Sequence, residues 1–333
     1  MDKTNKTIGL LALSGIKGIG PAFIKKIISN DIFSTPNIAE EIKDILLSSK
    51  KEVCEDEVSN QVDKAEETIF RCNRENVKII SIIDDNYPSR LKAIKDPPAI
   101  IYCKGNIELL KKNTICIIGT REPNENGMRI AERVGAYYFS NQWTVCNGLA
   151  EGVDNHSIMS IDKNYSNVIG VMSGGLNYNQ RNTLLKKTAE NAEKVLRKGG
   201  LLISEMSLDK KEDTFSVIKS CRIQAGVSNG LLLIQSPLDG GSRFTAKAFC
   251  ELPRPLAIIS PIQSDFDLPK YNANVEIIKK HKIGLSAFAE IKLDKIYTSD
   301  ILIIKSKNDY SKFEELMLKQ IECINSSKIT LFD

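Results

Sequence analysis

Short apolar runs alternate with amphipathic segments through the middle of the chain, and this alternation predicts an α/β fold. Residues 114–118 form a run rich in β-branched side chains that stops at a glycine turn, residues 119–121. A helix-length segment follows near 127–140, and a second apolar run occupies 143–146. Strand, glycine turn, helix and strand in succession are typical of a βαβ unit. We therefore predict a mostly parallel sheet flanked by helices.

The first part of the chain has a helical pattern instead. An apolar run at 8–13 leads into the sequence Gly-Ile-Lys-Gly-Ile-Gly at 15–20, and Pro21 suits the first turn of the next helix. Two helices around such a turn resemble a helix-hairpin-helix, whose turn amides can hold a DNA phosphate or serve only for packing. Residues 40–75 are charged and helix-prone. They carry an apolar stripe that we interpret as a core face, made by Leu46, Leu47, Val53, Val58, Val62, Ala65, Ile69 and Phe70.

The last part of the chain returns to an α/β pattern. Residues 300–305 are predicted to form a strand, and residues 310–325 an amphipathic helix. The helix and the apolar tail at 326–333 either pack on the sheet or dock a partner protein, and we expect packing. The apolar face of this helix consists of Phe313, Leu316, Met317, Ile321 and Ile324.

The glycine turns that follow the predicted strands are candidate phosphate sites. Glycines at strand ends let backbone N–H groups approach an anion, and the N-terminus of the next helix favours negative charge. Such turns lie at 119–121 and again at 147–154. Glycine turns also occur in sheets that bind nothing, because tight loops need positive φ. The Rossmann pattern G-x-G-x-x-G is absent, so both interpretations stay open.

Composition adds mainly exclusions. The 333 residues, 42% of them hydrophobic and 26% charged, are typical of a soluble globular protein. No apolar run is long enough to span a bilayer and the N-terminus has no signal-peptide pattern, so we expect a cytoplasmic protein without a membrane partner. The 8 cysteines form no C-x-x-C pair and only 2 histidines are present. We therefore expect buried free thiols, no metal site and no cofactor.

The distribution of charge is more informative than the net charge of +4. Between Tyr178 and Arg222 there are 10 Lys or Arg against 6 Asp or Glu, a balance of +4 that equals that of the whole chain. A concentrated basic segment is expected where a polyanion binds. Part of this charge has a simpler interpretation, the solvated face of a helix, which we favour for Lys186, Lys187, Lys194, Arg197 and Lys198.

Several motifs occur in a fixed order along the middle of the chain. They read Y-P-S-R-L at 87–91, D-P-P at 96–98, K-G-N at 104–106, G-T-R at 119–121, N-G-L-A-E-G-V-D at 147–154, L-L-I-S-E at 201–205, R-I-Q-A-G-V-S at 222–228 and G-S-R-F-T-A at 241–246. A strand at 168–172 and its turn at 173–176 fall between the fifth and sixth of them. Together these motifs resemble the DprA/Smf family of DNA-processing proteins over residues 80–290.

The resemblance implies an extended Rossmann-like fold and three parts. Residues 1–76 form an N-terminal helical domain of helix-hairpin-helix or SAM-like type, and residues 77–291 form the Rossmann-like domain. Residues 292–333, where the resemblance stops, form a small C-terminal α/β extension of unknown role.

Three departures from the family motifs affect the expected site. Glu151 stands where the family carries Arg or Lys, and Ser220 and Cys221 replace the first two residues of its R-N-R. The sequence at 178–182 lacks the proline of the family's Y-P-x-x-N. Fewer cations mean fewer neutralised phosphates, so we expect weakened or abolished binding of single-stranded DNA. Lys219 lies three residues before Arg222 on the same helix face and could partly compensate.

The resemblance also implies a function and a set of site residues. Family members bind single-stranded DNA without catalysis, hand it to a RecA-type recombinase in transformation, and form homodimers. Arg121 would contact phosphate at the first turn, above an amide-lined floor of glycines, with further cations flanking it. The full set is Gly119, Thr120, Arg121, Gly148, Gly174, Gly175, Arg181, Lys219, Arg222, Gly240, Gly241, Ser242 and Arg243.

Two alternatives remain open at this stage. The altered basic positions and the absence of a winged-helix signature also fit a relative repurposed for anti-phage defence or a toxin–antitoxin system. There the C-terminal part would hold a toxin or effector protein. The second alternative is a nucleotide-binding or nucleotide-cleaving enzyme. The P-G-G-x-G-T motif of such enzymes shares only Gly240 and Gly241 with this chain. His156 has no nucleophile motif beside it, so we expect no catalytic residue.

Overall fold

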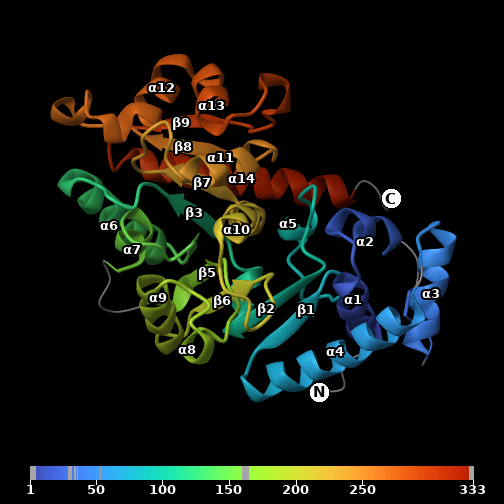
Figure 1. The fold of residues 1–333 in the computed structure, drawn as a ribbon. Helices are drawn as coiled ribbons and strands as arrows, with labels where there is room; N and C mark the ends of the chain where they lie inside the picture. Colours follow the sequence, from blue (N-terminus) through green and yellow to red (C-terminus); the bar gives the residue numbers. More distant parts are fainter. Residues whose placement is uncertain are drawn as a thin grey trace.

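The computed structural model describes residues 5–28, 32–33, 35, 37–52, 54–159 and 165–329 (Figure 1). The described part of the chain contains one nine-stranded sheet in the order β1-β2-β6-β5-β4-β3-β7-β8-β9. From β6 to β9 all neighbouring strands are parallel, and β1 and β2 extend one edge in antiparallel fashion. The strands are β1 Lys78–Ser81, β2 Ile100–Gly105, β3 Thr114–Ile118, β4 Thr144–Asn147, β5 Val168–Met172, β6 Leu201–Ser204, β7 Gly230–Leu233, β8 Leu256–Ile259 and β9 Ile301–Ile304.

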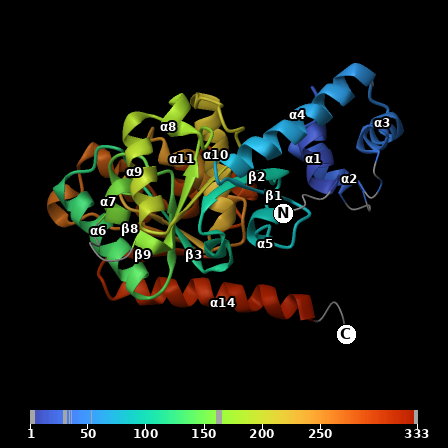
Figure 2. The same cartoon turned by 90° about the horizontal axis from the view of Figure 1, so that it is seen from below.

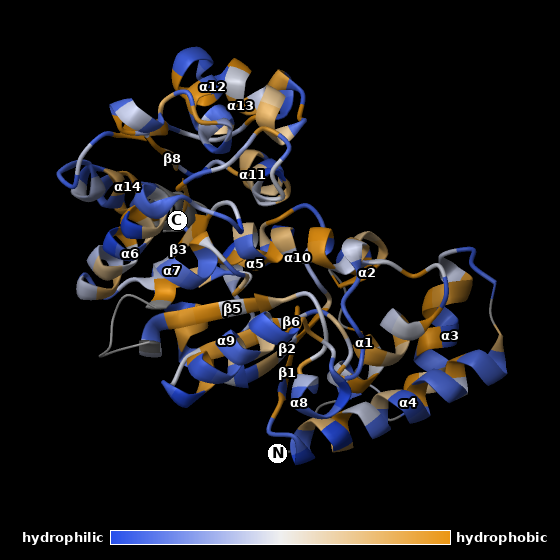
Figure 3. Ribbon diagram, turned by 60° about the vertical axis from the view of Figure 1, so that its left-hand side comes forward, coloured by the Kyte–Doolittle hydropathy of each residue, from blue (hydrophilic) through white to orange (hydrophobic). Residues whose placement is uncertain are grey.

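The central strands are buried on both faces, which explains why they read as continuous apolar runs. Every residue of β3, β4, β5, β6, β7 and β8 is buried. Helices cover the sheet: α5 Ser89–Lys92, α6 Glu125–Ser140, α7 Val153–Met159, α8 Tyr178–Arg181, α9 Lys186–Arg197, α10 Thr214–Val227, α11 Ser242–Cys250, α12 Asn272–Lys280 and α13 Lys282–Ala289. In Figure 3 the strands are mainly hydrophobic and the helices carry hydrophilic outer faces. The predicted mostly parallel, Rossmann-like architecture is confirmed.

Strand order reverses once, between β3 and β7. The chain moves from β3 through β4, β5 and β6 in one direction, then returns through α10 to place β7 on the other side of β3. In open parallel sheets, ligands bind at the carboxyl ends of strands next to such a reversal. The two loops at this point touch, because the Thr120 N–H donates to the Gln235 carbonyl over 2.7 Å.

The N-terminal helices form a small bundle beside β1 (Figure 2). They are α1 Asn5–Gly15, α2 Pro21–Ile27, α3 Ile38–Ser48 and α4 Glu55–Arg74. The stripe predicted over residues 40–75 is divided between α3 and α4, and Leu46, Val58 and Ala65 are buried as expected. Two of its members were wrongly placed in the core, since Leu47 is 62% and Phe70 68% exposed. Val53 lies outside the described residues.

The C-terminal segment is built into the sheet unit. Strand β9 pairs in parallel with β8, and α14 Asp309–Ile329 packs on α6 with Phe313 and Met317 fully buried. The Glu314 carboxylate accepts hydrogen bonds of 2.8 Å from both the Trp143 indole and the Tyr137 hydroxyl. The expected packing of this helix is thus observed, and residues 330–333 lie outside the described part.

Two further observations concern composition. Seven cysteines are described, all as free thiols, and six of them are buried. Burial raises the pKa of Cys146 and of Cys250 to about 12, so these thiols are unreactive small hydrophobic groups. Among the described helices, none has the length and apolar character that a bilayer crossing needs.

The packing of α14 can be tested through Phe313. Phe313→Ala removes a fully buried ring and should lower the free energy of unfolding by about 3–5 kcal/mol. Leu318→Ala on the same helix, where the side chain is 38% exposed, should lower it by less than about 1 kcal/mol. Urea unfolding followed by the fluorescence of Trp143, the single tryptophan, measures both. Equal effects would contradict the assigned packing.

Candidate functional site

The predicted site residues gather where the parallel strands end, which we call the carboxyl edge. Eleven of the thirteen lie in the loops after β3, β4, β5 and β7 or in the short helices that begin there, and Lys219 and Arg222 lie in α10 after β6. Parallel strands place all these loops at one edge of the sheet. The contacts of each loop then decide which groups remain free to bind a ligand.

The backbone of Thr120, in the first turn, is already hydrogen-bonded on both sides. The Thr120 N–H bonds to Gln235, the Thr120 carbonyl accepts from the Val153 N–H at 3.1 Å, and the Thr120 hydroxyl accepts from the Glu122 N–H at 3.2 Å. A Cβ on Gly119 would lie 2.5 Å from a Val153 methyl, so only glycine permits this close packing. The guanidinium of Arg121 is exposed and forms no ion pair within the described residues. It is the group that this turn presents to solvent.

A carboxylate of the chain itself occupies the amides of the second turn. Asp154 Oδ2 accepts from the Gly148 N–H at 3.0 Å and from the Ala150 N–H at 3.3 Å. Burial raises the pKa of Asp154 to about 7, although the two amides and nearby Arg121 act in the opposite direction. The expected amide floor at Gly148 is therefore filled by Asp154. Glu151, on the same turn, is exposed.

The third turn is closed by neighbouring backbone. The Gly175 N–H donates to the Lys210 carbonyl over 2.8 Å, and the Gly174 carbonyl accepts from the Ser204 hydroxyl over 2.8 Å. A Cβ on Gly174 would lie 2.2 Å from the Thr183 carbonyl oxygen, and one on Gly175 would lie 2.1 Å from that of Ser207. These glycines allow close chain approach and do not face an open cleft.

Arg222 and Lys219 neutralise carboxylates of the chain. The Arg222 guanidinium forms two bonds of 2.8 and 2.9 Å to Glu205 and one of 2.9 Å to Asp96. Burial lowers the pKa of Arg222, but the two carboxylates outweigh it and raise the pKa above its ordinary value. Lys219 Nζ lies 3.2 Å from Glu205. The D-P-P, L-L-I-S-E and R-I-Q-A-G-V-S motifs thus meet in one ion cluster.

The turn after β7 is partly open. The Gly240 N–H bonds to Pro237, and the Ser242 hydroxyl lies 2.7 Å from that of Ser236. Gly241 is exposed, with no atom within 4 Å of an added Cβ. Arg243 is held in place, because its Nη1 donates to the Asp239 carbonyl over 2.9 Å and its guanidinium lies 4.9 Å from the ring centre of Phe244.

Two sequence features outside the predicted set lie in quite different surroundings. The hairpin at 15–20 turns toward the sheet, and the Lys17 N–H donates to Glu57 over 3.3 Å, so a carboxylate again binds an amide considered for phosphate. His156 Nδ1 lies 3.0 Å from Glu132 Oε1. Within the described chain, no group of three or more His, Cys, Asp or Glu is arranged to hold a metal ion.

Sequence reasoning missed an exposed apolar group among the cations of the edge. Phe215 is 74% exposed in the first turn of α10, and Leu185 is 58% exposed before α9. Glu212 links the two segments, because its N–H donates to Thr183 over 2.9 Å and its carboxylate accepts from the Leu185 N–H. The available signal was an isolated phenylalanine soon after the Lys-Lys pair at 210–211.

Four exposed cations of the edge form no ion pair within the described residues. They lie after β3, after β5 and after β6, and are Arg121, Arg181, Lys186 and Lys211. Lys210, by contrast, binds Asp213 over 2.6 Å and holds the pKa of that carboxyl down to about 2. The edge thus presents exposed cations and an exposed aromatic ring, beside backbone N–H groups that are already hydrogen-bonded at Thr120, Gly148, Gly175 and Gly240.

Comparison with known proteins places these features in a family context. A family model described as DNA recombination-mediator protein A matches residues 78–289. DNA processing protein DprA of Bacillus subtilis is 28% identical over 198 residues, which cover 59% of this chain and 65% of that protein. Protein Smf of Escherichia coli is 27% identical over 188 residues, 56% of this chain and 49% of that protein. The matched region therefore spans about half to two thirds of these relatives.

Solved structures agree with the fold. DprA from Streptococcus pneumoniae aligns with a TM-score of 0.65 and 22% identity, over 93% of this chain and 97% of that one. DprA from Helicobacter pylori, whose structure is described as giving insight into its single-stranded DNA binding mode, aligns with a TM-score of 0.53 and 21% identity, over 61% of this chain and 87% of that one. At these identities the likeness shows the fold alone.

The partly buried Asp154 should give stability a characteristic pH dependence. Between its ordinary pKa of 3.8 and about 7, the folded chain holds a proton that the unfolded chain has lost. The contribution of Asp154 to stability therefore falls as the pH rises through this window, by at most about 1.4 kcal/mol per pH unit, and is constant above it. Asp154→Asn should remove this slope. Unfolding free energies of both proteins from pH 5 to 8 test it, and a difference that does not change with pH would contradict it.

Proposed function

We propose that this chain, which belongs to the DprA/Smf family of DNA-processing proteins, binds single-stranded DNA at its carboxyl edge without catalysing a reaction. One observation carries the proposal: unpaired cations and an exposed aromatic ring share that edge. Arg121, Arg181 and Lys211 contact phosphates, together with Lys186, which the sequence alone assigned to the solvated face of a helix, and Phe215 stacks on a base. Proteins that bind single strands without sequence preference combine these two elements, because cations follow the backbone and every base has a face that can stack.

The residues predicted from sequence take three roles in this proposal. Arg121 and Arg181 bind the strand, and Arg243 and Gly241 lie at the open turn after β7, where the strand leaves the edge. Gly119, Thr120, Gly148, Gly174, Gly175, Gly240 and Ser242 shape the turns that hold these side chains, since their backbones pack closely on neighbouring loops. Lys219 and Arg222 balance Glu205 and add little free charge.

The affinity in this proposal depends strongly on salt. Each phosphate neutralised contributes about 0.7 to the slope of log affinity against log salt for a single strand. Glu151 lies beside the first turn, where an added Cβ on Gly152 would touch the carbonyls of Thr120 and Arg121. Its charge opposes that of Arg121, so binding is weaker than with a cation at this position. Transfer of the strand to a RecA-type recombinase and assembly as a homodimer complete the proposal, and both rest on the family.

A second candidate function is favoured by the same acidic position. With Glu151 at the rim and Ser220 and Cys221 in α10, the edge carries less positive charge than the family motifs specify. A relative repurposed for defence, in which DNA or nucleotide regulates a toxin or effector partner, would tolerate this loss. Absence of binding to a 30-nucleotide single strand at low salt would favour this second function over the first.

The charge around the first turn, carried by Arg121 and the neighbouring Glu151, can be changed in both directions. Arg121→Ala should weaken single-strand binding by about 1–2 kcal/mol and reduce the salt slope, because one phosphate contact is lost. Glu151→Arg should strengthen binding and steepen the slope. Lys112→Ala is the matched control, since Lys112 is an exposed, unpaired cation in the described chain just before β3, at the opposite edge. Fluorescence anisotropy at several salt concentrations measures all three, and unchanged slopes for the rim variants would remove this turn from the interface.

The stacking role of Phe215 predicts a different signature. Phe215→Ala should weaken binding by about 1–3 kcal/mol with no change in the salt slope, since stacking on a base neutralises no phosphate. Phe70→Ala is the control, because Phe70 is similarly exposed, at 68% against 74%, but lies on α4. Equal affinities of wild type and Phe215→Ala would place the strand away from α10.

A further inference from the structure

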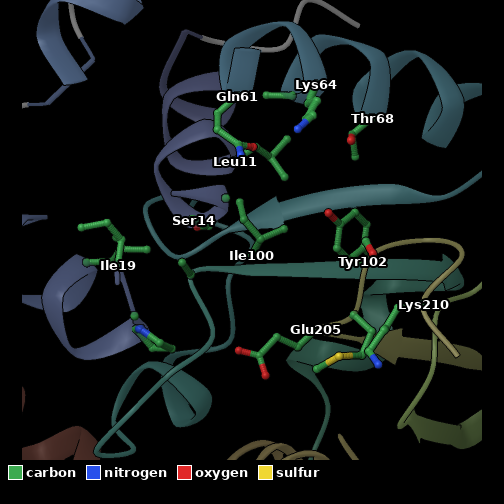
Figure 4. A pocket seen from close by; sticks show the side chains of 18 of the residues that line it. Leu11, Ser14, Ile19, Gln61, Lys64, Thr68, Ile100, Tyr102, Glu205 and Lys210 are labelled. Atoms are coloured by element: carbon green, nitrogen blue, oxygen red, sulfur yellow. The ribbon is translucent and has the colours of Figure 1, made fainter. Parts of the chain in front are cut away.

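A cavity of about 560 Å³ separates the N-terminal helices from the sheet (Figure 4). Helices α1, α2 and α4 form one wall, and β2, the loop after β6 and α10 form the other. Its volume lies within the range of small-molecule sites in proteins, about 300–1,000 Å³. The cavity is separate from the turns after β3, β4 and β7. Of the thirteen site residues predicted from sequence, only Lys219 of α10 lines it.

The two ends of the cavity differ in chemistry. Leu11 and Ile100 lie near each other in Figure 4, with Ile19 to one side and Lys64 beside Gln61 above Leu11. Thr68, Tyr102 and Lys210 lie toward the other end. Such a division suits a ligand with a flat apolar body and a charged group, because the body leaves water while the charge meets cations.

The lining carries excess positive charge. The lining contains three lysines, Lys64, Lys210 and Lys219, and one carboxylate, Glu205, while Lys210 is also paired with Asp213 over 2.6 Å. Glu205 is already bound by Arg222 at 2.8 Å and Lys219 at 3.2 Å. Lys64 forms no ion pair within the described residues, although it lies across the cavity from two other lysines. The ligand that balances this charge is an anion.

An unsatisfied hydroxyl points independently to a ligand. Tyr102 is only 6% exposed, its side chain forms no hydrogen bond within the described chain, and it lines the cavity. The Tyr102 hydroxyl can therefore donate a hydrogen bond to, and accept one from, a molecule in the cavity. The side chains of Gln61 and Thr68, which line the same wall of α4, form no hydrogen bond within the described residues either and are free to bind a base or sugar.

We propose that this cavity binds a nucleotide, with its base against the apolar end and its phosphate at Lys64, Lys210 and Lys219. Tyr102 donates a hydrogen bond to the bound nucleotide. The nucleotide is either free or the terminal nucleotide of a strand that leaves the carboxyl edge at Lys210. Only the strand-end form rests on the proposed function. Because both walls contact it, the bound nucleotide fixes the helical domain against the sheet and stabilises the folded chain by mass action.

The full-length protein and dAMP, with deoxyadenosine and inorganic phosphate as partial ligands, test the proposal. Calorimetry should give saturable binding of dAMP, with much weaker binding of either part. Lys64→Ala should weaken dAMP about tenfold or more, since a charged hydrogen bond is lost. Tyr102→Phe should weaken it about two- to tenfold without destabilising the free protein, because the hydroxyl has no partner there.

Two further variants locate the site. Arg74→Ala, which removes an exposed cation of the same helix, and Arg121→Ala at the first turn should both leave dAMP binding unchanged. Binding that is lost in Arg121→Ala but kept in Lys64→Ala and Tyr102→Phe would overturn the proposal and place the nucleotide at the carboxyl edge. The proposal is equally overturned if no dAMP binds at millimolar concentration, or if phosphate alone binds as tightly.

Competition distinguishes the two sources of the nucleotide and separates this proposal from the proposed function. Displacement of dAMP by a linear strand with a 5′-phosphate, but not by a closed circular strand, assigns the strand end. Absence of displacement by both assigns the free nucleotide. Strand binding without dAMP binding overturns only the cavity proposal, whereas dAMP binding without any strand binding overturns only the proposed function.

Discussion

A parallel sheet brings the ends of its strands and the starts of its helices to one edge, and the unpaired N–H groups there need acceptors. In this chain acidic side chains supply many of them. Asp154 binds the amides of the second turn, Asp213 caps α10, and Glu212 joins the loops after β5 and β6. Several of the backbone N–H groups that would attract phosphate to this edge therefore already bind carboxylates of the chain. The positive charge that a polyanion can still reach lies on exposed lysine and arginine side chains.

This constraint explains which sequence-based expectations succeeded. The strands at 114–118 and 168–172 were placed from their buried apolar runs and their glycine boundaries, and both have the expected limits. The glycines were correctly expected in turns, and at Gly174 and Gly175 a carbonyl oxygen 2.2 and 2.1 Å from an added Cβ excludes other residues. Their expected role as an amide floor meets a competitor at Gly148, where Asp154 occupies the amide. The acceptor of the Gly148 amide is six residues away along the chain, and no periodic pattern reports on such a contact.

Other features depend on contacts between distant segments and carry little local signal. Arg222 was expected to be a free cation, but it joins Glu205 and Asp96, which come from separate motifs. Phe215 was not identified, since a single exposed ring has no periodicity. The cavity beside α4 exists only because the hairpin at 15–20 and the loop after β6 face each other. Each of these positions could be found only after the chain was folded.

Backbone amides and exposed cationic side chains bind nucleic acid in different ways. Backbone amides and helix N-termini bind phosphate at defined positions, whereas exposed lysines and arginines follow a flexible backbone with little positional demand. A chain that satisfies its amides with Asp154 and Asp213 therefore loses precise phosphate sites and keeps diffuse ones. The precise recognition that we propose lies instead in the cavity between the helices and the sheet, which the Tyr102 side chain lines without a hydrogen bond in the described chain. The two proposals, loose binding along the edge and specific binding in the cavity, thus rest on the same distribution of carboxylates.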